Sequence, residues 1–273
     1  MNILYCGDDG VKDGVLVSVL SLIRNVHEPL HIYIMTVRYP GVKPFSERAA
    51  LFLDKIVRKS NARGFVRLID ATDAFTARLP KKNMGSYFTP CSMLRLYIDK
   101  MPELAALDRI LYLDYDVVCR RDPSEFYEMD LTGIEAAGVL DMYGRRWYHY
   151  HGLLVQDYMN SGVMLFNIDE CKKTGVFEKA VKLCATRRML LPDQAALNKA
   201  ISRRKLLPRK YNEQGERPEA DTVLHHFSNN FKFWPYFRVQ KVKPFQVDKV
   251  HEILKIHEYD DILEEYLALK INL

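Results

Sequence analysis

The triplet Asp114-Tyr115-Asp116 combines residue types and a spacing that suit a metal ion. In an extended backbone, residues i and i+2 point to the same side, so the two carboxylates can converge on one cation while Tyr115 faces away. Oxygen ligands of this kind suit Mg²⁺ or Mn²⁺. Asp is also common at strand ends and in turns, so the triplet alone is weak evidence and its place in the fold must decide.

Asp8 and Asp9 lie between an apolar run and a predicted helix, and two roles are open to them. Either carboxylate could accept hydrogen bonds from a base or a ribose. The same residues, followed by Gly10, also suit a helix cap or a tight turn. Both roles stay open at this point.

His225 and His226 are adjacent in a short segment that is predicted to be a strand. Only one of them can face the same side as the apolar Leu224, because side chains alternate along a strand. One histidine could bind a metal, although a lone buried histidine is more often a core residue. Lys232, six residues after His226, could neutralise a phosphate or simply be exposed to solvent.

The elements that must position these residues alternate between apolar strands and helices. This alternation is typical of a parallel sheet covered by helices on both faces. Asp114 directly follows a predicted strand, at the carboxyl end where open α/β sheets bind ligands, and this strengthens the metal hypothesis. The predicted strands span residues 3–6, 31–36, 65–70, 109–113, 136–140 and 161–168, and the predicted helices 15–23, 45–59, 90–101, 170–187 and 193–202.

The composition is that of an ordinary globular protein. Its 273 residues include 40 Lys and Arg against 35 Asp and Glu, a formal charge of +5. The two signs are interspersed along the chain, so an anionic small molecule or a membrane surface is a better partner than nucleic acid. The length predicts one large domain or two small ones.

Cysteine usage and hydropathy predict a cytoplasmic protein. The five cysteines are odd in number and none forms a CxxC motif, which argues against a disulfide framework and a zinc site. We find no secretory leader at the start of the sequence and no run near the ~20 apolar residues that span a bilayer. We therefore expect a soluble protein, or one bound peripherally at the inner face of the membrane.

Two segments lack a motif but suggest a role. Residues 141–158 are rich in aromatic and basic side chains without periodicity, which predicts a long loop. This loop either binds an acceptor sugar by stacking or decorates the surface, and its closure over a donor would exclude water. After residue 237, apolar residues recur at helical spacing, and we expect these helices to pack on the domain rather than on a membrane.

Six segments form an ordered set: residues 2–9 (NILYCGDD), 92–96 (SMLRL), 109–118 (RILYLDYDVV), 160–167 (NSGVMLFN), 193–198 (DQAALN) and 226–232 (HFSNNFK). Together they resemble the retaining glycosyltransferases of family eight, which include bacterial lipooligosaccharide galactosyltransferases and glycogenin. The resemblance implies an α/β fold of the glycosyltransferase-A type, with a Rossmann-like, mostly parallel central sheet and helices on both faces. It also implies a catalytic domain over residues 1–236, followed by a helical extension over 237–273.

The resemblance further implies a UDP-glucose or UDP-galactose donor and a manganese or magnesium ion. Such a metal would neutralise the charge of the leaving diphosphate. The implied metal ligands are Asp114, Asp116 and His226, and the implied UDP contacts are Cys6, Asp8, Tyr115 and Lys232. The implied sugar pocket is lined by Arg95, Asp141 and Asn160, with Asp193 and Gln194 near the anomeric carbon.

Retention of configuration allows two mechanisms. One uses a carboxylate nucleophile and a covalent intermediate, and the other is front-face attack in which the leaving phosphate accepts the acceptor's proton. Gln194 is a poor nucleophile, so the resemblance favours front-face attack with Gln194 stabilising positive charge. Asp193 is the alternative nucleophile, although it could also cap a helix after Pro192.

Two positions depart from the family pattern. Gly10 stands where several relatives carry Asn, which weakens a contact to the base or ribose. Asn229 stands where relatives usually have a Gly that lets the backbone approach the diphosphate, which puts the geometry of the phosphate loop in question.

The sequence thus predicts a metal-dependent retaining hexosyltransferase. It would move glucose or galactose to a glycan, a lipopolysaccharide or glycolipid, or a protein-linked acceptor. The alternative is a catalytically silent protein that binds a sugar nucleotide or a carbohydrate, and such a protein would be expected to lack a metal ligand. A sugar-nucleotide pyrophosphorylase is disfavoured, because the acidic segment Gly7-Asp8-Asp9-Gly10 would repel a triphosphate.

Overall fold

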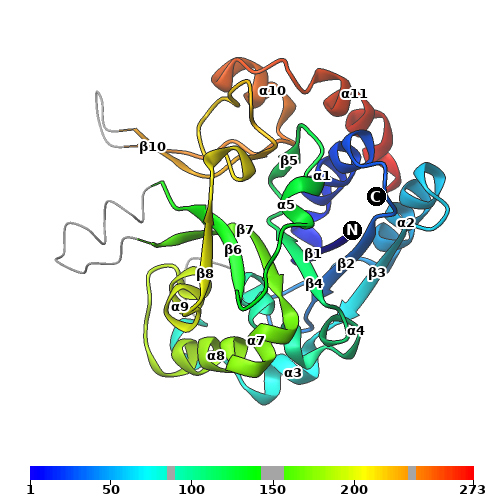
Figure 1. Ribbon diagram of the computed structural model, residues 1–273. Helices are drawn as coiled ribbons and strands as arrows, with labels where there is room; N and C mark the ends of the chain where they lie inside the picture. The colour runs from blue at the N-terminus through cyan, green and yellow to red at the C-terminus, as the bar shows by residue number, and fades with distance from the viewer. Residues whose placement is uncertain (85–89, 143–156, 233–237) are drawn as a thin grey trace.

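A seven-stranded sheet in the order β3-β2-β1-β4-β7-β6-β8 forms the centre of the molecule, with helices on both faces (Figure 1). The computed structural model describes residues 1–84, 90–142, 157–232 and 238–273. The predicted layered α/β architecture is confirmed. The strands are β1 (Asn2–Cys6), β2 (His31–Thr36), β3 (Phe65–Asp70), β4 (Arg109–Leu113), β5 (Val117–Cys119), β6 (Ala136–Leu140), β7 (Met159–Asn167), β8 (Arg204–Leu207), β9 (Leu224–His226), β10 (Asn230–Lys232) and β11 (Arg238–Gln240).

Strand β7 runs against its two neighbours, β4 and β6. The other sheet strands are parallel where they pair with one another, so the sheet is mostly parallel, as expected. The alternation of strands and helices does not predict the direction of β7. Because β7 is reversed, its first residues, from Met159 on, lie at the same sheet edge as the carboxyl end of β4. That edge is the one where Asp114 follows β4.

The helices differ from expectation at two places. The single helix expected over 170–187 is divided at Gly175, whose positive φ of 69° ends one helix and begins the next. The helix expected over 90–101 is a 3₁₀ segment, η3 (Pro90–Lys100). The α-helices are α1 (Lys12–Asn25), α2 (Glu47–Ser60), α3 (Thr72–Ala77), α4 (Pro102–Ala105), α5 (Ser124–Tyr127), α7 (Ile168–Thr174), α8 (Val176–Thr186), α9 (Pro192–Ala200), α10 (Val247–Lys249) and α11 (Asp260–Leu269).

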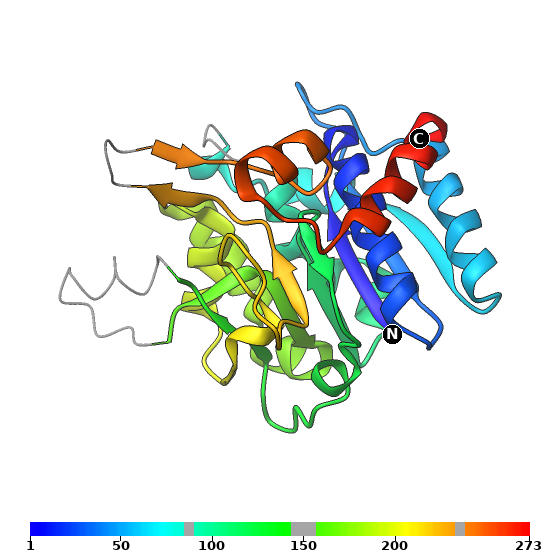
Figure 2. The ribbon, with the colours of Figure 1, turned by 90° about the horizontal axis from the view of Figure 1, so that it is seen from above.

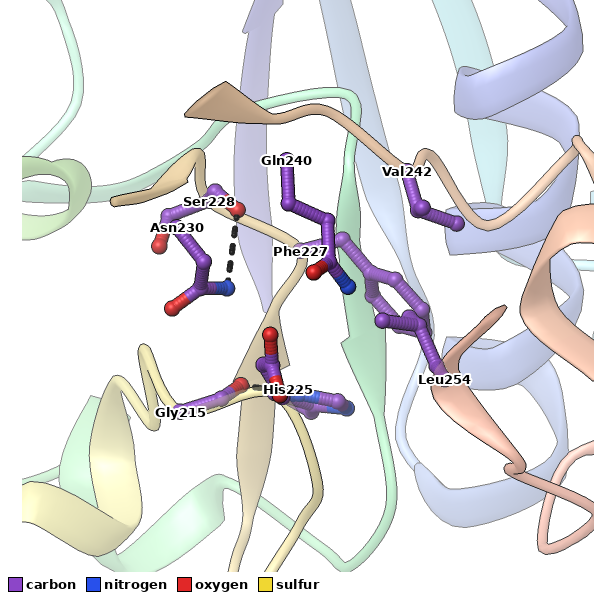
Figure 3. Close-up of a pocket in the computed structure, with 9 residues that line it drawn as sticks. Gly215, His225, Phe227, Ser228, Asn230, Gln240, Val242 and Leu254 are labelled. Atoms are coloured by element: carbon purple, nitrogen blue, oxygen red, sulfur yellow. Dashed lines mark hydrogen bonds between the residues drawn. The ribbon is translucent and has the colours of Figure 1, made fainter. Parts of the chain in front are cut away.

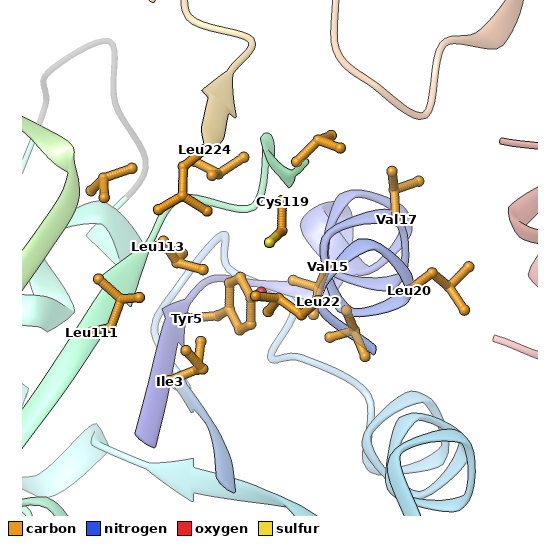
Figure 4. Close-up of a cluster of buried hydrophobic side chains, with 14 of the residues drawn as sticks. Ile3, Tyr5, Val15, Val17, Leu20, Leu22, Leu111, Leu113, Cys119 and Leu224 are labelled. Carbon is orange, nitrogen blue, oxygen red and sulfur yellow. The ribbon is translucent and has the colours of Figure 1, made fainter. Parts of the chain in front are cut away.

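Each face of the sheet has its own apolar core. Side chains alternate along β1, so Ile3 and Tyr5 join the core that contains α1 and α2, whereas Leu4 and Cys6 join the core that contains η3 and α8. Figure 4 shows the first core, where α1 packs on β1 and β4. Burial on both faces fixes the positions of the strand ends that carry the polar residues.

The C-terminal segment packs against α1 (Figure 2). The Tyr266 hydroxyl of α11 donates to Asp13 at 2.7 Å, and Arg24 pairs with Glu265 at 2.8 Å. A domain boundary near residue 237 stays a prediction, although these contacts agree with the expected packing of the terminal helices. Across the described residues, none of the helices has the length and apolar character needed to cross a membrane.

Candidate functional site

Asp114, Asp116 and His226 meet at the carboxyl end of β4, and we call them the carboxylate–histidine group. The antiparallel ribbon of β5 and β9 brings them together, because its register places Val117 opposite His226. The backbone N–H of Phe227 also donates to the carbonyl of Asp116 at 2.9 Å. The Nε2 atom of His226 lies 3.7 Å from Asp114 Oδ2 and 3.4 Å from Asp116 Oδ1.

Each carboxylate of this group is held at its outer oxygen by a protein cation. Arg95 Nη2 donates to Asp114 Oδ1 at 2.9 Å, and the Tyr112 hydroxyl donates to the same atom at 2.6 Å. Lys243 Nζ pairs with Asp116 Oδ2. The inner oxygens, Asp114 Oδ2 and Asp116 Oδ1, are therefore the ones directed at the imidazole.

The charges around Asp116 keep it ionised. Burial by itself would raise the pKa of this carboxyl, but the Lys243 ammonium and His226 hold its pKa well below the usual range. Asp116 is only 4% exposed, and its Oδ1 atom accepts no hydrogen bond. A buried, charged oxygen without a donor is costly unless a cation completes its environment.

The residues present fit a divalent metal ion. Besides the unpartnered Asp116 oxygen, the glycine at 162 lets two of the ligands pack directly against the backbone: a Cβ there would clash, at 2.2 Å from His226 Cε1 and 2.8 Å from Asp114 Oδ2. Two carboxylates and one imidazole form a mixed oxygen and nitrogen donor set, which suits Mn²⁺. Mg²⁺ accepts the same carboxylates but favours oxygen over imidazole.

Asn212 orients the imidazole of His226. Its Oδ1 lies 3.2 Å from His226 Nδ1, which assigns the proton to Nδ1 and leaves the Nε2 lone pair toward the two carboxylates. Asn212 is fully buried, and its Nδ2 donates to Asn160 Oδ1 at 3.0 Å. The sequence analysis did not identify Asn212, because no local motif includes it and it contacts His226 only after the chain has folded.

A buried polar network joins Asn160, Asp141 and Gln194, three residues predicted for the sugar pocket and the reacting centre. Asp141 Oδ2 accepts from Asn160 Nδ2 at 2.9 Å and from Gln194 Nε2 at 3.2 Å. Gln194 Oε1 accepts from the backbone N–H of Ser161 at 2.9 Å. All four residues are buried, so the network is rigidly positioned.

Arg95 links this network to the metal ligands. Its Nη1 donates to the Ser161 carbonyl at 2.6 Å, and its Nε lies 3.4 Å from Asp193 Oδ2, while Nη2 holds Asp114. Asp193 lies in the first turn of α9 and is buried. Burial raises the pKa of the Asp193 carboxyl, while the Arg95 guanidinium opposes that rise. Asp193 and Asp114 therefore share one guanidinium.

Two of the four predicted UDP contacts, Cys6 and Asp8, lie at the neighbouring end of β1. Cys6 is the last residue of β1 and is buried in the core that contains η3 and α8. Asp8 caps the short helix η1 (Asp9–Val11), because its Oδ1 accepts from the backbone N–H of Gly10 at 2.9 Å. The capping role expected for Asp8 is therefore confirmed, and only one of its two carboxylate oxygens takes part in the cap.

Tyr115 faces away from the metal ligands, as expected from the alternation of side chains. Its ring packs on α1, where a Cβ at Gly14 would lie 2.5 Å from Tyr115 Cδ2, and its centroid is 6.4 Å from that of Phe245. Lys232 is the last residue of β10 and pairs with Arg238 of β11. The structure describes only the backbone of Lys232, so its phosphate contact stays a prediction.

His225 belongs to the core and not to the metal ligands. It is fully buried, with Nδ1 at 2.9 Å from the Tyr259 hydroxyl and Nε2 at 3.0 Å from the Gly215 carbonyl. Burial lowers its pKa to about 4, so it is neutral. The two adjacent histidines therefore face opposite sides of the strand, as predicted: His226 faces the carboxylates and His225 faces the core.

A small cavity is lined by residues of β9, β10 and β11 and of the chain segments next to them (Figure 3). No member of the carboxylate–histidine group lines it. It therefore does not mark the donor site. Its lining consists of Gly215, Glu216, His225, Phe227, Ser228, Asn230, Gln240, Val242 and Leu254.

Two other sequence interpretations can be placed. The aromatic and basic residues of the loop predicted over 141–158 lie almost entirely outside the described residues, so its acceptor role is untested. Asn229, where relatives usually carry Gly, is not among the residues with positive φ in the described chain. The backbone at this position therefore does not require glycine for its conformation.

Comparison with known proteins gives one family and a consistent fold. The family model described as glycosyl transferase family 8 matches residues 2–237. A lipopolysaccharide 1,2-glucosyltransferase of Escherichia coli K12 is 29% identical over 220 residues, covering 78% of this chain and 62% of that protein. A second Escherichia coli enzyme of the same name is 25% identical over 303 aligned positions, covering 98% of this chain and 86% of that protein.

Among solved structures, the galactosyltransferase LgtC in complex with donor and acceptor sugar analogues superposes with a TM-score of 0.67 at 16% identity. The match covers 97% of this chain and 96% of LgtC. The likeness establishes a shared glycosyltransferase-A fold. The chain spans less than two thirds of the length of the K12 relative.

Proposed function

The chain belongs to glycosyl transferase family 8, and from this premise we propose that it is a metal-dependent retaining hexosyltransferase that uses UDP-glucose or UDP-galactose. The observation that carries the proposal is the convergence of Asp114 Oδ2, Asp116 Oδ1 and His226 Nε2 at the carboxyl end of β4. All three predicted ligands are present. This disfavours the alternative of a catalytically silent binding protein.

The carboxylate–histidine group would hold the metal. A divalent cation bound there would supply positive charge to the diphosphate leaving group. Arg95 and Lys243 keep the outer carboxylate oxygens occupied, and Asn212 keeps the imidazole in the tautomer whose Nε2 can act as a ligand. The ligands therefore need little rearrangement to bind a metal.

Asp141, Asn160 and Arg95 would recognise the hydroxyls of the sugar. These side chains are buried and belong to one hydrogen-bonded network, so their polar groups are fixed in direction. Such fixed polar groups discriminate between sugars better than flexible ones, because a wrong hydroxyl leaves a buried donor or acceptor unpaired. Glucose and galactose differ at one hydroxyl, so this network would decide between them.

Front-face attack is the mechanism that the contacts support best. Asp193, the alternative nucleophile, is engaged by the Arg95 guanidinium, which offsets part of the basicity that burial gives its carboxylate. Gln194 is held at both ends of its amide by Asp141 and Ser161. A rigid amide in this place can stabilise positive charge on the sugar while the departing phosphate accepts the acceptor's proton.

The acceptor would be a sugar hydroxyl of a lipopolysaccharide or of another glycolipid or glycan. The two Escherichia coli relatives are named as lipopolysaccharide glucosyltransferases, and they motivate this choice. An acceptor of this class is presented at a membrane surface. We therefore expect peripheral contact of the protein with the membrane, which sedimentation with vesicles that contain the acceptor would detect.

The first test is release of free UDP from a panel of UDP-hexoses, with and without Mn²⁺. We expect slow hydrolysis of one donor with the metal, and a loss of about 100- to 1000-fold with Asp116→Asn, which keeps the shape but removes a charged ligand. Asp260→Asn, at a surface carboxylate of the C-terminal segment, is the matched control and should keep full turnover.

The outcomes distinguish the hexosyltransferase from the catalytically silent binding protein. Donor binding by calorimetry without any turnover, even when acceptor glycans are supplied, would favour the silent sugar-nucleotide-binding protein. Absence of both binding and turnover for every UDP-hexose would overturn the proposed donor class.

A further inference from the structure

Lys243 reaches the carboxylate–histidine group from the C-terminal segment, beyond the residues 2–237 that match the family model. It lies between β11 and α10, and its side chain is only 18% exposed. Its Nζ pairs with Asp116 Oδ2 and donates to the carbonyl of Phe227 at 3.0 Å. It also lies 6.0 Å from the centroid of the Tyr115 ring. A largely buried ammonium therefore stands beside a proposed metal ligand.

Protein cations offset much of the charge of the two carboxylate ligands before any metal binds. Asp114 and Asp116 contribute two negative charges, and Arg95 and Lys243 contribute two positive charges at the outer oxygens. Asp193 also shares the Arg95 guanidinium, so the offset is incomplete at Asp114, whereas Lys243 pairs with Asp116 alone among the ion pairs of the described residues. The attraction that two unpaired carboxylates would exert on a divalent cation is therefore reduced, most of all at Asp116.

The two protein cations differ in how many partners they have. Arg95 is also paired with Asp193 and donates to the Ser92 and Ser161 carbonyls, so its guanidinium has several protein partners. Among the described residues, Lys243 has two acceptors for its three N–H groups, Asp116 and the Phe227 carbonyl. One N–H of Lys243 is thus available to a ligand that arrives at the site.

We propose that Lys243 makes metal binding depend on the nucleotide. In the free protein its ammonium neutralises Asp116 and weakens the binding of a metal ion. When a nucleoside diphosphate binds, its phosphates provide a counter-charge for both cations, and the uncommitted N–H of Lys243 can donate to a phosphate oxygen. This inference rests on the proposed function, since it concerns the metal and diphosphate of the same site.

Lys243 does not occupy the Asp116 oxygen that would bind the metal ion. Lys243 contacts Asp116 Oδ2, while Oδ1 is the unpartnered atom near His226. The metal ion and the ammonium can therefore bind opposite oxygens of one carboxylate at the same time. Lys243 would weaken the metal by charge repulsion across that carboxylate, and it would not have to leave.

The test measures Mn²⁺ affinity from the electron paramagnetic resonance signal of free Mn²⁺, with and without UDP. In the wild type, UDP should tighten Mn²⁺ binding by at least about 10-fold, within the usual range of coupling between ligands. In Lys243→Met, Mn²⁺ alone should bind about 10-fold more tightly, and the enhancement by UDP should shrink by a similar factor. The exposed Lys249→Met, which removes the same charge from the same segment, should behave as the wild type.

Thermal unfolding supplies a second readout that does not depend on activity. Lys243→Met leaves the buried Asp116 without its cation, so the metal-free variant should melt below the wild type. Mn²⁺ alone should then raise the melting temperature of the variant more than that of the wild type. Lys243→Arg keeps the positive charge and should retain the weak Mn²⁺ binding of the free protein.

The outcomes distinguish this inference from the proposed function. If the wild type binds neither Mn²⁺ nor UDP, the proposed function fails, and this inference fails with it. If the wild type binds both and Lys243→Met shows the same Mn²⁺ affinity and the same response to UDP, the role of Lys243 alone is wrong. Weaker Mn²⁺ binding by Lys243→Met without UDP would also overturn it, because that result indicates positioning rather than repulsion.

Discussion

Two regions of the molecule each bring three possible metal ligands close together, and they differ in burial and in the partners of the ligand atoms. The carboxylate–histidine group and a second group, His251, His257 and Asp260, each place their ligand atoms within 4.8 Å of one another. We call the second the surface histidine group. It lies on the C-terminal segment, where His257 is exposed and the other two residues are half-buried.

The two groups differ in how their ligand atoms are satisfied. In the surface histidine group, Asp260 Oδ1 lies 2.7 Å from His251 Nε2 and Oδ2 lies 3.1 Å from His257 Nδ1, so the ligands bond to each other. In the carboxylate–histidine group, outside partners hold the outer atoms and leave Asp116 Oδ1 unpartnered. Proximity of ligands is therefore a weaker sign of a metal site than the surrounding residues that keep the ligand atoms open.

The largest expected effect is the loss of metal affinity when an inner oxygen is removed. In the presence of UDP, Asp116→Asn should weaken Mn²⁺ binding by about 100-fold or more by calorimetry, because it removes a charged ligand from a buried site. Asp260→Asn should leave Mn²⁺ binding unchanged. Equal losses in the two variants would remove the distinction between the two groups.

A substitution at Gly162 tests whether the metal ligands His226 and Asp114 must pack closely against the backbone. Gly162→Ala would place a methyl group against His226 and Asp114, so we expect Mn²⁺ affinity to fall about 10- to 100-fold and the free energy of unfolding to fall by about 1 to 3 kcal/mol. Gly138→Ala is the control, since its Cβ would lie 3.3 Å from the flexible Met159 sulfur and 3.4 Å, an ordinary van der Waals distance, from the Val163 carbonyl oxygen. Wild-type Mn²⁺ binding by Gly162→Ala would show that the close approach of His226 and Asp114 to the backbone at residue 162 is not needed.

The pH dependence of stability tests whether His225 is a neutral core residue and not a metal ligand. Its pKa is about 4 in the folded protein against 6.5 in the unfolded chain, so between these values the unfolded state binds a proton that the native state does not. The free energy of unfolding should therefore fall as the pH falls below about 6.5, by about 1.4 kcal/mol per pH unit. Urea unfolding across this range measures the slope, which should be smaller in His225→Gln. An unchanged slope in that variant would assign the pH dependence to other groups.

The smallest effects are expected at the surface histidine group. His257→Ala should change the free energy of unfolding by less than about 1 kcal/mol, because an exposed ion pair contributes little. It should also leave UDP release from the donor unchanged. A loss of UDP release of more than about 10-fold would show that this group takes part in function, and the comparison made above would be wrong.

Local patterns predicted the parts of the site that depend on neighbours in the chain. The strand that ends at Leu113 and the carboxylates that follow it are adjacent in sequence, so alternation and an apolar run were enough to place Asp114 at a sheet edge. The same reasoning placed only one of the two histidines toward the site. It could not choose between the capping and nucleotide-binding roles of Asp8, and the cap is the contact that the structure describes.

The sequence by itself determined the layered α/β fold, the family and the identity of the proposed metal ligands, because hydrophobic periodicity and ordered motifs are local properties of the chain. Only the tertiary structure decided the direction of β7, the contact of Asn212 with the imidazole of His226 and the position of Lys243 beside Asp116. The physical reason is that these features depend on pairing between segments far apart in the chain: Lys243 and Asp116 are 127 positions apart. Spacing in the sequence carries no information about such contacts until the core has packed.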